Sequence, residues 1–147
     1  LVPALRTDDG LVLTENAALL QYVADHFPQA GIATEPGMER SRLHQWLCFI
    51  GTELHKALFV PLLDKTAPPE AKTYALGKNL SRLDYLENYL KDREFLLDHF
   101  SVADAYLFTV CTWCQYVGID TAGLPNLTAF VARVAARPAV QAALPAR

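Results

Sequence analysis

The residues of this sequence that are best suited to bind a small charged ligand stand where a predicted strand gives way to a predicted helix. Thr14-Glu15-Asn16 follows the strand-like Leu11-Val12-Leu13, and apolar residues at helical spacing begin at Ala17. The first turn of a helix has unpaired backbone N–H groups and a partial positive charge, so it can bind a carboxylate. Plain capping of the helix by these residues is the alternative interpretation.

A second group of polar side chains recurs along one long predicted helix. One face carries His44, Cys48, Gly51, His55 and Phe59, each three, four or seven positions from another. A separate core face carries Leu43, Ile50, Leu54 and Leu58. Glu53 and Lys56 point elsewhere, away from His55. Two polar faces on one helix predict two different neighbours.

The histidines and the cysteine on this helix also suit a zinc site. However, Cys48 and His55 are separated by more than one helical turn, and the sequence shows no fourth ligand. We therefore expect no metal. Ordinary packing of these side chains, without any ligand role, is a further alternative.

Cys111-Thr112-Trp113-Cys114 matches the C-x-x-C pattern of redox proteins. A redox pair belongs at a helix N-terminus, where the helix dipole lowers the thiol pKa. Here the pair falls in mid-helix, two turns past Ser101, so we expect both thiols to be buried as small hydrophobic groups. Trp113 also lies seven positions after Tyr106, and the pair could line an apolar pocket or pack in the core.

The elements that must position these residues form two unequal parts. Val2-Pro3-Ala4-Leu5, the turn signal Asp8-Asp9-Gly10, a second strand and a helix ending near Pro28 make up residues 1–27. Two strands and one helix cannot close a core alone. Because the chain also starts at Leu1 without a Met, we expect the rest of that unit to precede Leu1. Residues 28–37 contain two glycines and a further proline and predict a linker.

Residues 38–147 predict an all-helical bundle. The long helix covers 39–63, and the next helix starts at Pro68-Pro69. Its expected apolar positions are Leu76, Leu80, Leu83, Leu86 and Leu90. Ser101, with Asp104 three residues later, predicts a capping-box helix start and a helix to about Val117. Pro125 and Pro138 open two short helices.

Composition limits the function classes. The chain has 147 residues, a net charge of −3, 20% charged and 52% hydrophobic residues. The charge excludes a basic nucleic-acid or anionic-membrane binder, and the apolar surplus predicts a face that contacts a partner. We see no signal peptide and no apolar run long enough to span a bilayer. Three cysteines without framework spacing indicate a reducing compartment.

Four motifs in one register now resemble the glutathione transferases. The strand–turn–strand residues up to Leu13-Thr14-Glu15 resemble the end of their thioredoxin-like domain, and residues 100–107 resemble their helical-domain signature. Residues 52–56 and 137–141 look like the bacterial beta class. The resemblance covers the whole chain. It implies a β-β-α thioredoxin-like end (1–27), a linker (28–37) and the C-terminal helical domain (38–147).

The resemblance also implies roles for individual residues. Glutathione would be bound by Val2 through a backbone exposed by a cis bond to Pro3, by Glu15 at its ammonium, and by Asn16 at its carboxylate. Thr52 and Glu53 would reach the glutathione of a second subunit, while His55 and Lys56 would face the sulfur of their own subunit. Phe59, Tyr106 and Trp113 would line the pocket of the hydrophobic substrate. The main catalytic group of this class, a cysteine, would lie before Leu1, which leaves His55 as an auxiliary residue.

The function implied is conjugation of glutathione to small hydrophobic electrophiles by a cytoplasmic homodimer that needs no metal. Thiol–disulfide exchange is a possible additional reaction of the class. Two alternatives stay open. One is a non-catalytic binding module of the same fold, which would not need Glu15 and His55 together. The other is a relative with a dedicated isomerase or dehalogenase reaction.

Overall fold

The computed structural model describes residues 2–144. It begins with an antiparallel hairpin of β1 (Ala4–Arg6) and β2 (Val12–Thr14). Gly10 closes the turn at φ +89°, a conformation that favours glycine, and its N–H donates to the Thr7 carbonyl. The hairpin predicted from Asp8-Asp9-Gly10 is therefore confirmed. The register pairs Ala4 with Thr14, Leu5 with Leu13 and Arg6 with Val12.

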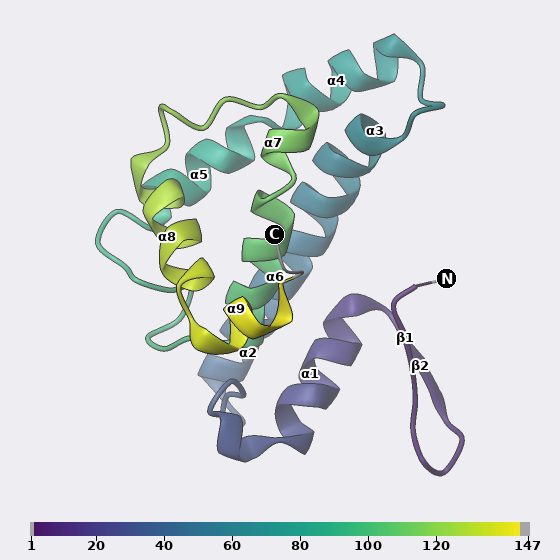
Figure 1. Cartoon of the computed structure of the whole chain (residues 1–147), viewed down its shortest axis with the longest axis vertical. Coiled ribbons are helices and arrows are strands. Elements are labelled where there is room, and N and C mark those ends of the chain that lie inside the picture. The colour runs from purple at the N-terminus through teal and green to yellow at the C-terminus, as the bar shows by residue number, and fades with distance from the viewer. Residues whose placement is uncertain (1, 145–147) are drawn as a thin grey trace.

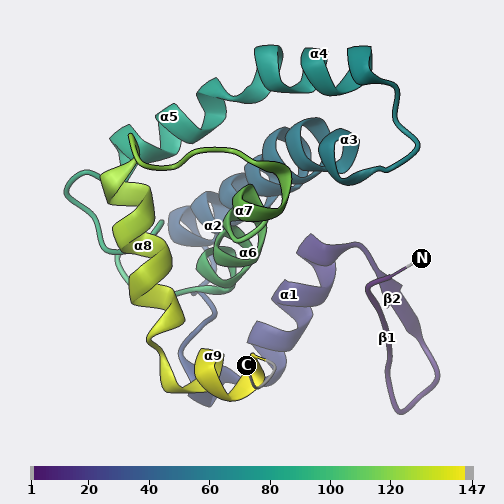
Figure 2. The same cartoon turned by 45° about the horizontal axis from the view of Figure 1, so that its top comes forward.

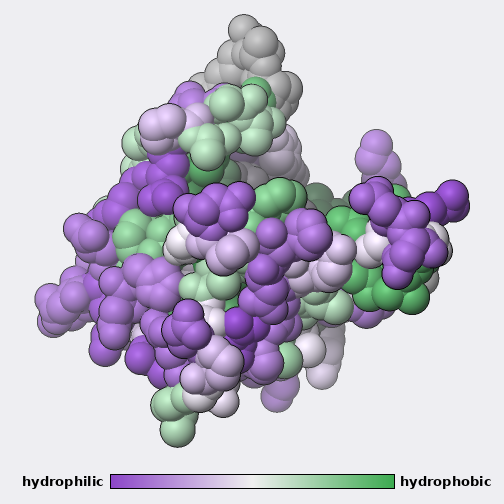
Figure 3. All heavy atoms as spheres, turned by 90° about the horizontal axis from the view of Figure 1, so that it is seen from below, coloured by the Kyte–Doolittle hydropathy of each residue, from purple (hydrophilic) through white to green (hydrophobic). Residues whose placement is uncertain are grey.

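The hairpin stands away from the helices and joins them through α1 (Asn16–His26), as both cartoon views show (Figures 1 and 2). The space-filling view places apolar side chains on this projecting part, at the right of Figure 3. Leu11 and Val12 contribute to that surface, at 57% and 54% exposure. A two-stranded sheet with an apolar surface is marginal by itself, which agrees with the expectation that this part contacts further protein.

One continuous helix of 26 residues, Met38–Leu63, runs through the middle of the bundle. Its ends are α-helical, α2 (Met38–Phe49) and α3 (Val60–Leu63), and its centre, η2 (Ile50–Phe59), is a π-helix. The Val60 N–H accordingly donates to the carbonyl of His55, five residues back. π-helical turns are rare and concentrate at functional sites. The predicted core face is confirmed, because Leu43, Ile50, Leu54 and Leu58 are all buried.

The same helix corrects one expectation from the sequence. By length and composition alone, Met38–Leu63 could cross a bilayer, whereas we expected no apolar run of that kind. Core helices of folded proteins share this composition. Here the helix packs against α4 and α6 within the bundle, and its central segment carries Glu53, His55 and Lys56. Its length and composition are therefore weak evidence for a membrane span.

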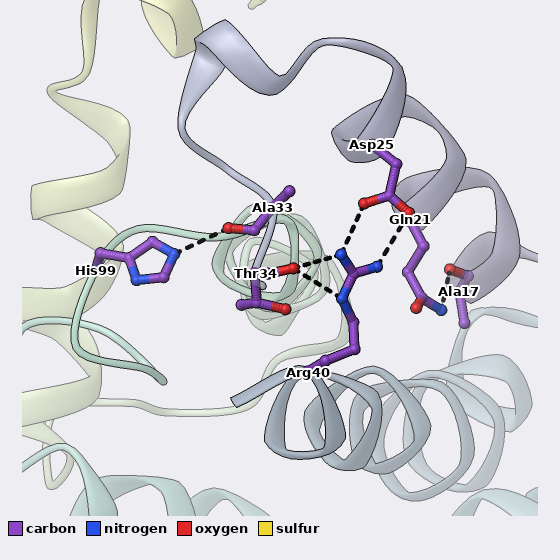
Figure 4. A network of polar contacts seen from close by, with 7 residues as sticks. All are labelled: Ala17, Gln21, Asp25, Ala33, Thr34, Arg40 and His99. Atoms are coloured by element: carbon purple, nitrogen blue, oxygen red, sulfur yellow. Dashed lines mark hydrogen bonds and ion pairs between the residues drawn. The ribbon is translucent and has the colours of Figure 1, made fainter. Parts of the chain in front are cut away.

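After a short 3₁₀ turn, η1 (Pro28–Ala30), the linker is tied to the elements on both sides (Figure 4). The Arg40 guanidinium donates to both carboxylate oxygens of Asp25, at 3.0 and 2.9 Å, and its Nε donates to the Thr34 carbonyl at 2.9 Å. Such a planar, two-pronged ion pair is geometrically specific. It fixes the C-terminal end of α1 to the start of α2, and the hydrogen bonds from Arg40, together with its charge, lower the pKa of Asp25.

The second helical stretch is divided into α4 (Pro69–Asn79) and α5 (Ser81–Tyr89). Leu83, Leu86 and Leu90 are buried as expected, but Leu76 and Leu80 are exposed at 36% and 42%. The reason is that α4 buries Asn79 in their place. Its side-chain amide donates to the carbonyls of Ala57 on η2 and Ala75 on α4.

The capping box at Ser101 is confirmed and extends further than predicted. In α6 (Val102–Cys111), buried Asp104 accepts hydrogen bonds from the Ser101 N–H and hydroxyl at 2.8 and 2.9 Å, and from the Leu96 N–H at 2.8 Å. Burial raises the pKa of the Asp104 carboxyl, and these hydrogen bonds oppose that rise. One side chain thus fixes both the helix start and the preceding loop.

The last helices start at prolines, as predicted: α8 (Pro125–Ala135) and α9 (Pro138–Ala143). The Glu87 carboxylate of α5 accepts the backbone N–H groups of Asn126 and Leu127 in the first turn of α8. A negative charge at a helix N-terminus is favourable. The predicted helix from Ser101 to Val117 is interrupted, however. It ends at Cys111, and a separate short turn, α7 (Cys114–Val117), follows.

Candidate functional site

His55 lies at the centre of the candidate site. Its Nδ1 is 2.8 Å from the Tyr106 hydroxyl on α6. The Trp113 ring meets the imidazole edge-on with centroids 4.9 Å apart, and also contacts Phe59 at 5.7 Å. Gly51, His55 and Phe59 of the predicted face therefore meet the residues predicted for the pocket, whereas His44 and Cys48, earlier on that face, are exposed. Phe59 is completely buried and supports Trp113 from beneath, whereas Trp113 itself is partly exposed.

Tyr106 connects this group to the start of α1. The Asn16 side chain and the Glu15 charge both lie close enough to this hydroxyl to affect its pKa. Gly51 gives the hydroxyl room, because a Cβ at that position would lie 3.8 Å from the Tyr106 oxygen. The helix start and the His55 face, about 40 residues apart in sequence, are thus brought to one place.

Glu15 is held in an unusual backbone conformation. Its φ is +67° and its ψ 121°, and it is the only non-glycine residue with positive φ among residues 2–144. Such conformations are uncommon for residues with a side chain and concentrate at functional sites. The conformation places Glu15 immediately before the unpaired N–H groups of α1.

The peptide bond between Val2 and Pro3 is cis, as expected. Val2 itself is 94% exposed. The strand that follows begins with Ala4, which pairs with Thr14 directly before Glu15. Val2 and Pro3 therefore lie beside the strand end that leads into α1.

The electrostatics of the site favour an uncharged imidazole. Burial lowers the pKa of His55, and the neighbouring positive charge of Lys56 lowers it further. Burial raises the pKa of Tyr106, as does the charge of Glu15, while the interaction with Asn16 opposes that rise. Near neutral pH the site therefore contains a neutral imidazole bonded to a protonated phenol.

The other predicted face of the long helix points away from this group. Glu53 forms an ion pair of 3.0 Å with Arg82 on α5, and each side chain is about a third exposed. The Thr52 hydroxyl donates to the Cys48 carbonyl at 3.0 Å and lies 3.3 Å from the Glu53 carboxylate. Within the chain, Thr52 and Glu53 are thus separated from His55. Nothing in the sequence pattern indicated Arg82, because pairing between two helices leaves no periodic signal.

The C-x-x-C pair lies across the break between α6 and α7 and not in mid-helix as expected. Both thiols are nevertheless buried, at 7% exposure for Cys111 and 4% for Cys114. Burial raises the pKa of Cys111, and it raises the pKa of Cys114 to about 11. A redox-active thiol needs the opposite shift. The prediction of buried, small hydrophobic cysteines is confirmed.

Two further features bear on where the site lies. A cavity of about 1060 Å³ between α6, α7 and α8 is lined by Cys111, Cys114 and Leu127 among others, but by none of the residues gathered at His55. Residues 2–144 contain no group of three or more His, Cys, Asp or Glu side chains placed to hold a metal. The grouping of His55, Tyr106, Asn16 and Glu15 is therefore the better candidate, because it brings polar groups from η2, α6 and the start of α1 to one place.

Comparison with known proteins finds relatives over nearly the whole chain. A family model described as "Glutathione S-transferase, C-terminal domain" matches residues 50–138. The glutathione S-transferase GstA of Escherichia coli O157:H7 is 42% identical over 147 residues, which cover 99% of this chain and 73% of that protein. A maleylacetoacetate isomerase of Pseudomonas aeruginosa is 25% identical, with 99% and 71% covered.

Two solved structures are similar over nearly the whole chain. A sphingomonad glutathione S-transferase complexed with glutathione superposes with a TM-score of 0.91 at 46% identity, covering 97% of this chain and 72% of that one. A bacterial beta class glutathione S-transferase of Sphingomonas chungbukensis gives a TM-score of 0.91 at 47% identity, with the same coverage of each chain.

Proposed function

The chain belongs to the glutathione S-transferase family, and we propose that the protein conjugates glutathione to small hydrophobic electrophiles. The observation that carries this proposal is the convergence of Glu15 and Asn16, Tyr106 and His55 at one place. A helix N-terminus with an adjacent carboxylate suits a group that has both an α-carboxylate and an α-ammonium. The γ-glutamyl end of glutathione is such a group.

We assign each part of the tripeptide to residues of this site. The carboxylate is bound by the backbone N–H and side chain of Asn16, and the ammonium by Glu15. The backbone of Val2, before Pro3, pairs with the cysteinyl part in the manner of an added strand. The sulfur then lies toward His55 and Lys56, whose positive charge favours a thiolate. His55 assists the group that activates the thiol, and no metal takes part.

The electrophile binds beside the sulfur. Trp113 is the partly exposed member of the aromatic group, and Tyr106 and Phe59 form its support. An apolar wall of this kind accepts hydrophobic compounds without strong discrimination between them. The proposed substrates are therefore small, hydrophobic and electrophilic.

The exposed face of the long helix is proposed to serve a second subunit of a cytoplasmic homodimer. Arg82 holds the Glu53 carboxylate at the surface, next to Thr52, where both can reach the glutathione bound by the partner. The division into a glutathione-binding part (1–27), a linker (28–37) and a helical domain (38–147) belongs to the same proposal. Light scattering of the full-length protein at several concentrations measures the oligomeric state.

A dedicated isomerase is the second candidate, because the maleylacetoacetate isomerase is also a relative. In an isomerisation the thiolate adds to a conjugated double bond and leaves again, so glutathione is regenerated. The test is therefore incubation of the full-length protein with glutathione and a chlorinated aromatic compound, followed by mass spectrometry. A product that carries glutathione supports the transferase. Tight binding of glutathione with no conjugate would favour the isomerase or a non-catalytic module, and no binding would overturn the proposal.

A further inference from the structure

The short contact between Tyr106 and His55 joins three elements of the site. The hydroxyl on α6 lies 2.8 Å from Nδ1 of His55 on η2. The Asn16 side chain at the start of α1 lies close enough to affect the pKa of the same hydroxyl. A phenol has one hydrogen to donate and an oxygen that accepts. The hydroxyl can therefore donate to only one of its two neighbours, and the choice decides which ring nitrogen of His55 carries a proton.

The chemistry of the neighbours indicates the direction. The side-chain amide of Asn16 has two N–H groups, so it can donate one to the Tyr106 oxygen and one to a carboxylate ligand. The Tyr106 hydrogen is then free for His55, whose imidazole is neutral near pH 7 and has one nitrogen that accepts.

We propose that Tyr106 is a positioning residue that donates its hydroxyl hydrogen to Nδ1 of His55 and thereby places the single ring proton on Nε2. The imidazole then offers an N–H donor, and not a basic lone pair, on the side of the ring away from Tyr106. For the proposed transferase, His55 would stabilise the developing thiolate by hydrogen bonding, and a different group would accept the thiol proton. The catalytic part of this inference rests on the proposed function, whereas the assignment of the ring proton does not.

The surroundings of the Tyr106–His55 contact restrict other orientations of the imidazole ring. Trp113 packs edge-on against the imidazole and limits its rotation. The charged groups that act on this pair are Lys56, next to His55 on the same helix, and Glu15, which acts on Tyr106. The Tyr106 residue is buried, at 6% exposure. A buried hydroxyl between two fixed partners is the arrangement that sets a single tautomer.

The experiment is nitrogen NMR of the full-length protein with ¹⁵N-labelled histidine, in which the shifts of the two ring nitrogens identify the protonated one. The chain has four histidines, and His55→Gln identifies the signal. We expect the Nε2–H form in the wild type and a mixture of forms in Tyr106→Phe. A predominant Nδ1–H form in the wild type, or an unchanged spectrum in Tyr106→Phe, would overturn the proposal.

A second variant reverses the direction without removing the hydroxyl. In Asn16→Asp the new carboxylate can only accept, so Tyr106 should donate to it and His55 should donate from Nδ1 to the phenol oxygen. The NMR signal should then change to the Nδ1–H form. A spectrum that retains Nε2–H in Asn16→Asp would contradict the role assigned to Asn16. This measurement needs no glutathione, so it stands even if the proposed reaction is wrong.

Kinetics test the catalytic part. Tyr106→Phe should lower kcat by about three- to tenfold, the scale of one neutral hydrogen bond, with KM for glutathione nearly unchanged. The bond that Tyr106→Phe removes stabilises the neutral imidazole, so its loss should raise the pKa of His55. The acidic limb of the profile of kcat against pH should therefore shift to higher pH. Tyr89→Phe is the control, since its hydroxyl donates to the Leu96 carbonyl at 2.8 Å away from the site. Equal losses in both variants, or an unshifted limb in Tyr106→Phe, would indicate a structural role only.

Discussion

The two polar faces of the long helix differ in how much water they meet. His55 is covered by Tyr106 and Trp113, and its pKa is lowered mainly by that burial. Glu53, two residues earlier, remains about a third exposed and pairs with Arg82. Burial shifts the pKa of a side chain such as His55, whereas exposure leaves a charge such as that of Glu53 available to an approaching molecule. The comparison teaches that neighbouring residues of one helix can serve chemistry and recognition separately.

The π-helical geometry supports this separation. In η2, Gly51, His55 and Phe59 follow one another along the face that meets α6, while Thr52 is exposed and Glu53 pairs with Arg82 on α5. Residues four apart lie on nearly the same face of such a helix. The local winding thus keeps the two sets of side chains apart over the whole length of the site.

The largest expected effect comes from the residue that fixes the start of α6, the helix that carries Tyr106. Asp104→Ala removes three hydrogen bonds and leaves the buried Leu96 N–H without its acceptor. We expect a loss of about 3 kcal/mol in the free energy of unfolding, from a lost cap and an unsatisfied donor. Chemical denaturation of the full-length variant measures it. A normal stability combined with lost glutathione affinity would mean that Asp104 belongs to the site.

Glu15→Gln should have the next largest effect, confined to recognition. The charge-assisted hydrogen bond from the glutathione ammonium contributes about 1.5–3 kcal/mol, so affinity should fall on the order of tenfold to a hundredfold. Asp8→Asn, on the exposed turn of the preceding hairpin, is the matched control for removing one charge. Calorimetry that finds unchanged affinity in Glu15→Gln would leave Glu15 as a helix-start residue only.

Arg82→Met should affect the exposed face alone and by less. Surface ion pairs contribute about 0–1 kcal/mol to stability, so unfolding should change little. Without the ion pair to Arg82, the Glu53 carboxylate is no longer held in one orientation toward glutathione. The KM for glutathione should therefore rise a fewfold, while kcat is retained. A fall in kcat at unchanged KM would show that the two faces are coupled.

The smallest effect is the pH dependence of stability due to His55. Because its pKa is lower in the folded protein than the ordinary value of 6.5, the unfolded chain takes up a proton first as the pH falls. Stability is therefore complete above that value and declines as the pH drops through it. The loss is small, since the ring is only partly buried. Thermal unfolding of wild type and His55→Gln between pH 8 and 5.5 should show a steeper decline in the wild type, and parallel curves would contradict this.

Local sequence signals predicted the helix starts better than the helix interiors. Ser101 with Asp104, and the prolines at 69, 125 and 138, fix helix starts through bonds and dihedral limits within a few residues. The breaks at Leu80 and Thr112 had no such signal. They depend on which side chains the neighbouring helices bury, as the exchange of Leu76 and Leu80 for Asn79 shows.

For the site, spacing predicted which residues share a face but not which atoms meet. The face of Gly51, His55 and Phe59 followed from helical periodicity, and Tyr106 and Trp113 were expected together from their separation of seven. The bond between His55 and Tyr106 joins residues 51 positions apart. The rotation of α6 against η2 sets that bond, and tertiary packing sets the rotation. The positive φ of Glu15 also could not be predicted from the sequence, because glutamate does not favour that conformation.

The most direct test of the division between the two faces is steady-state kinetics of His55→Ala and Glu53→Ala in the full-length protein, with dimer state checked by light scattering. His55→Ala should lower kcat by at most about a hundredfold, the lower end of general acid–base contributions, while the affinity for glutathione stays nearly constant. Glu53→Ala should weaken glutathione binding, and with it dimerisation, at nearly unchanged kcat. If His55→Ala alters only affinity, or Glu53→Ala alters only kcat, the assignment of the two faces is wrong.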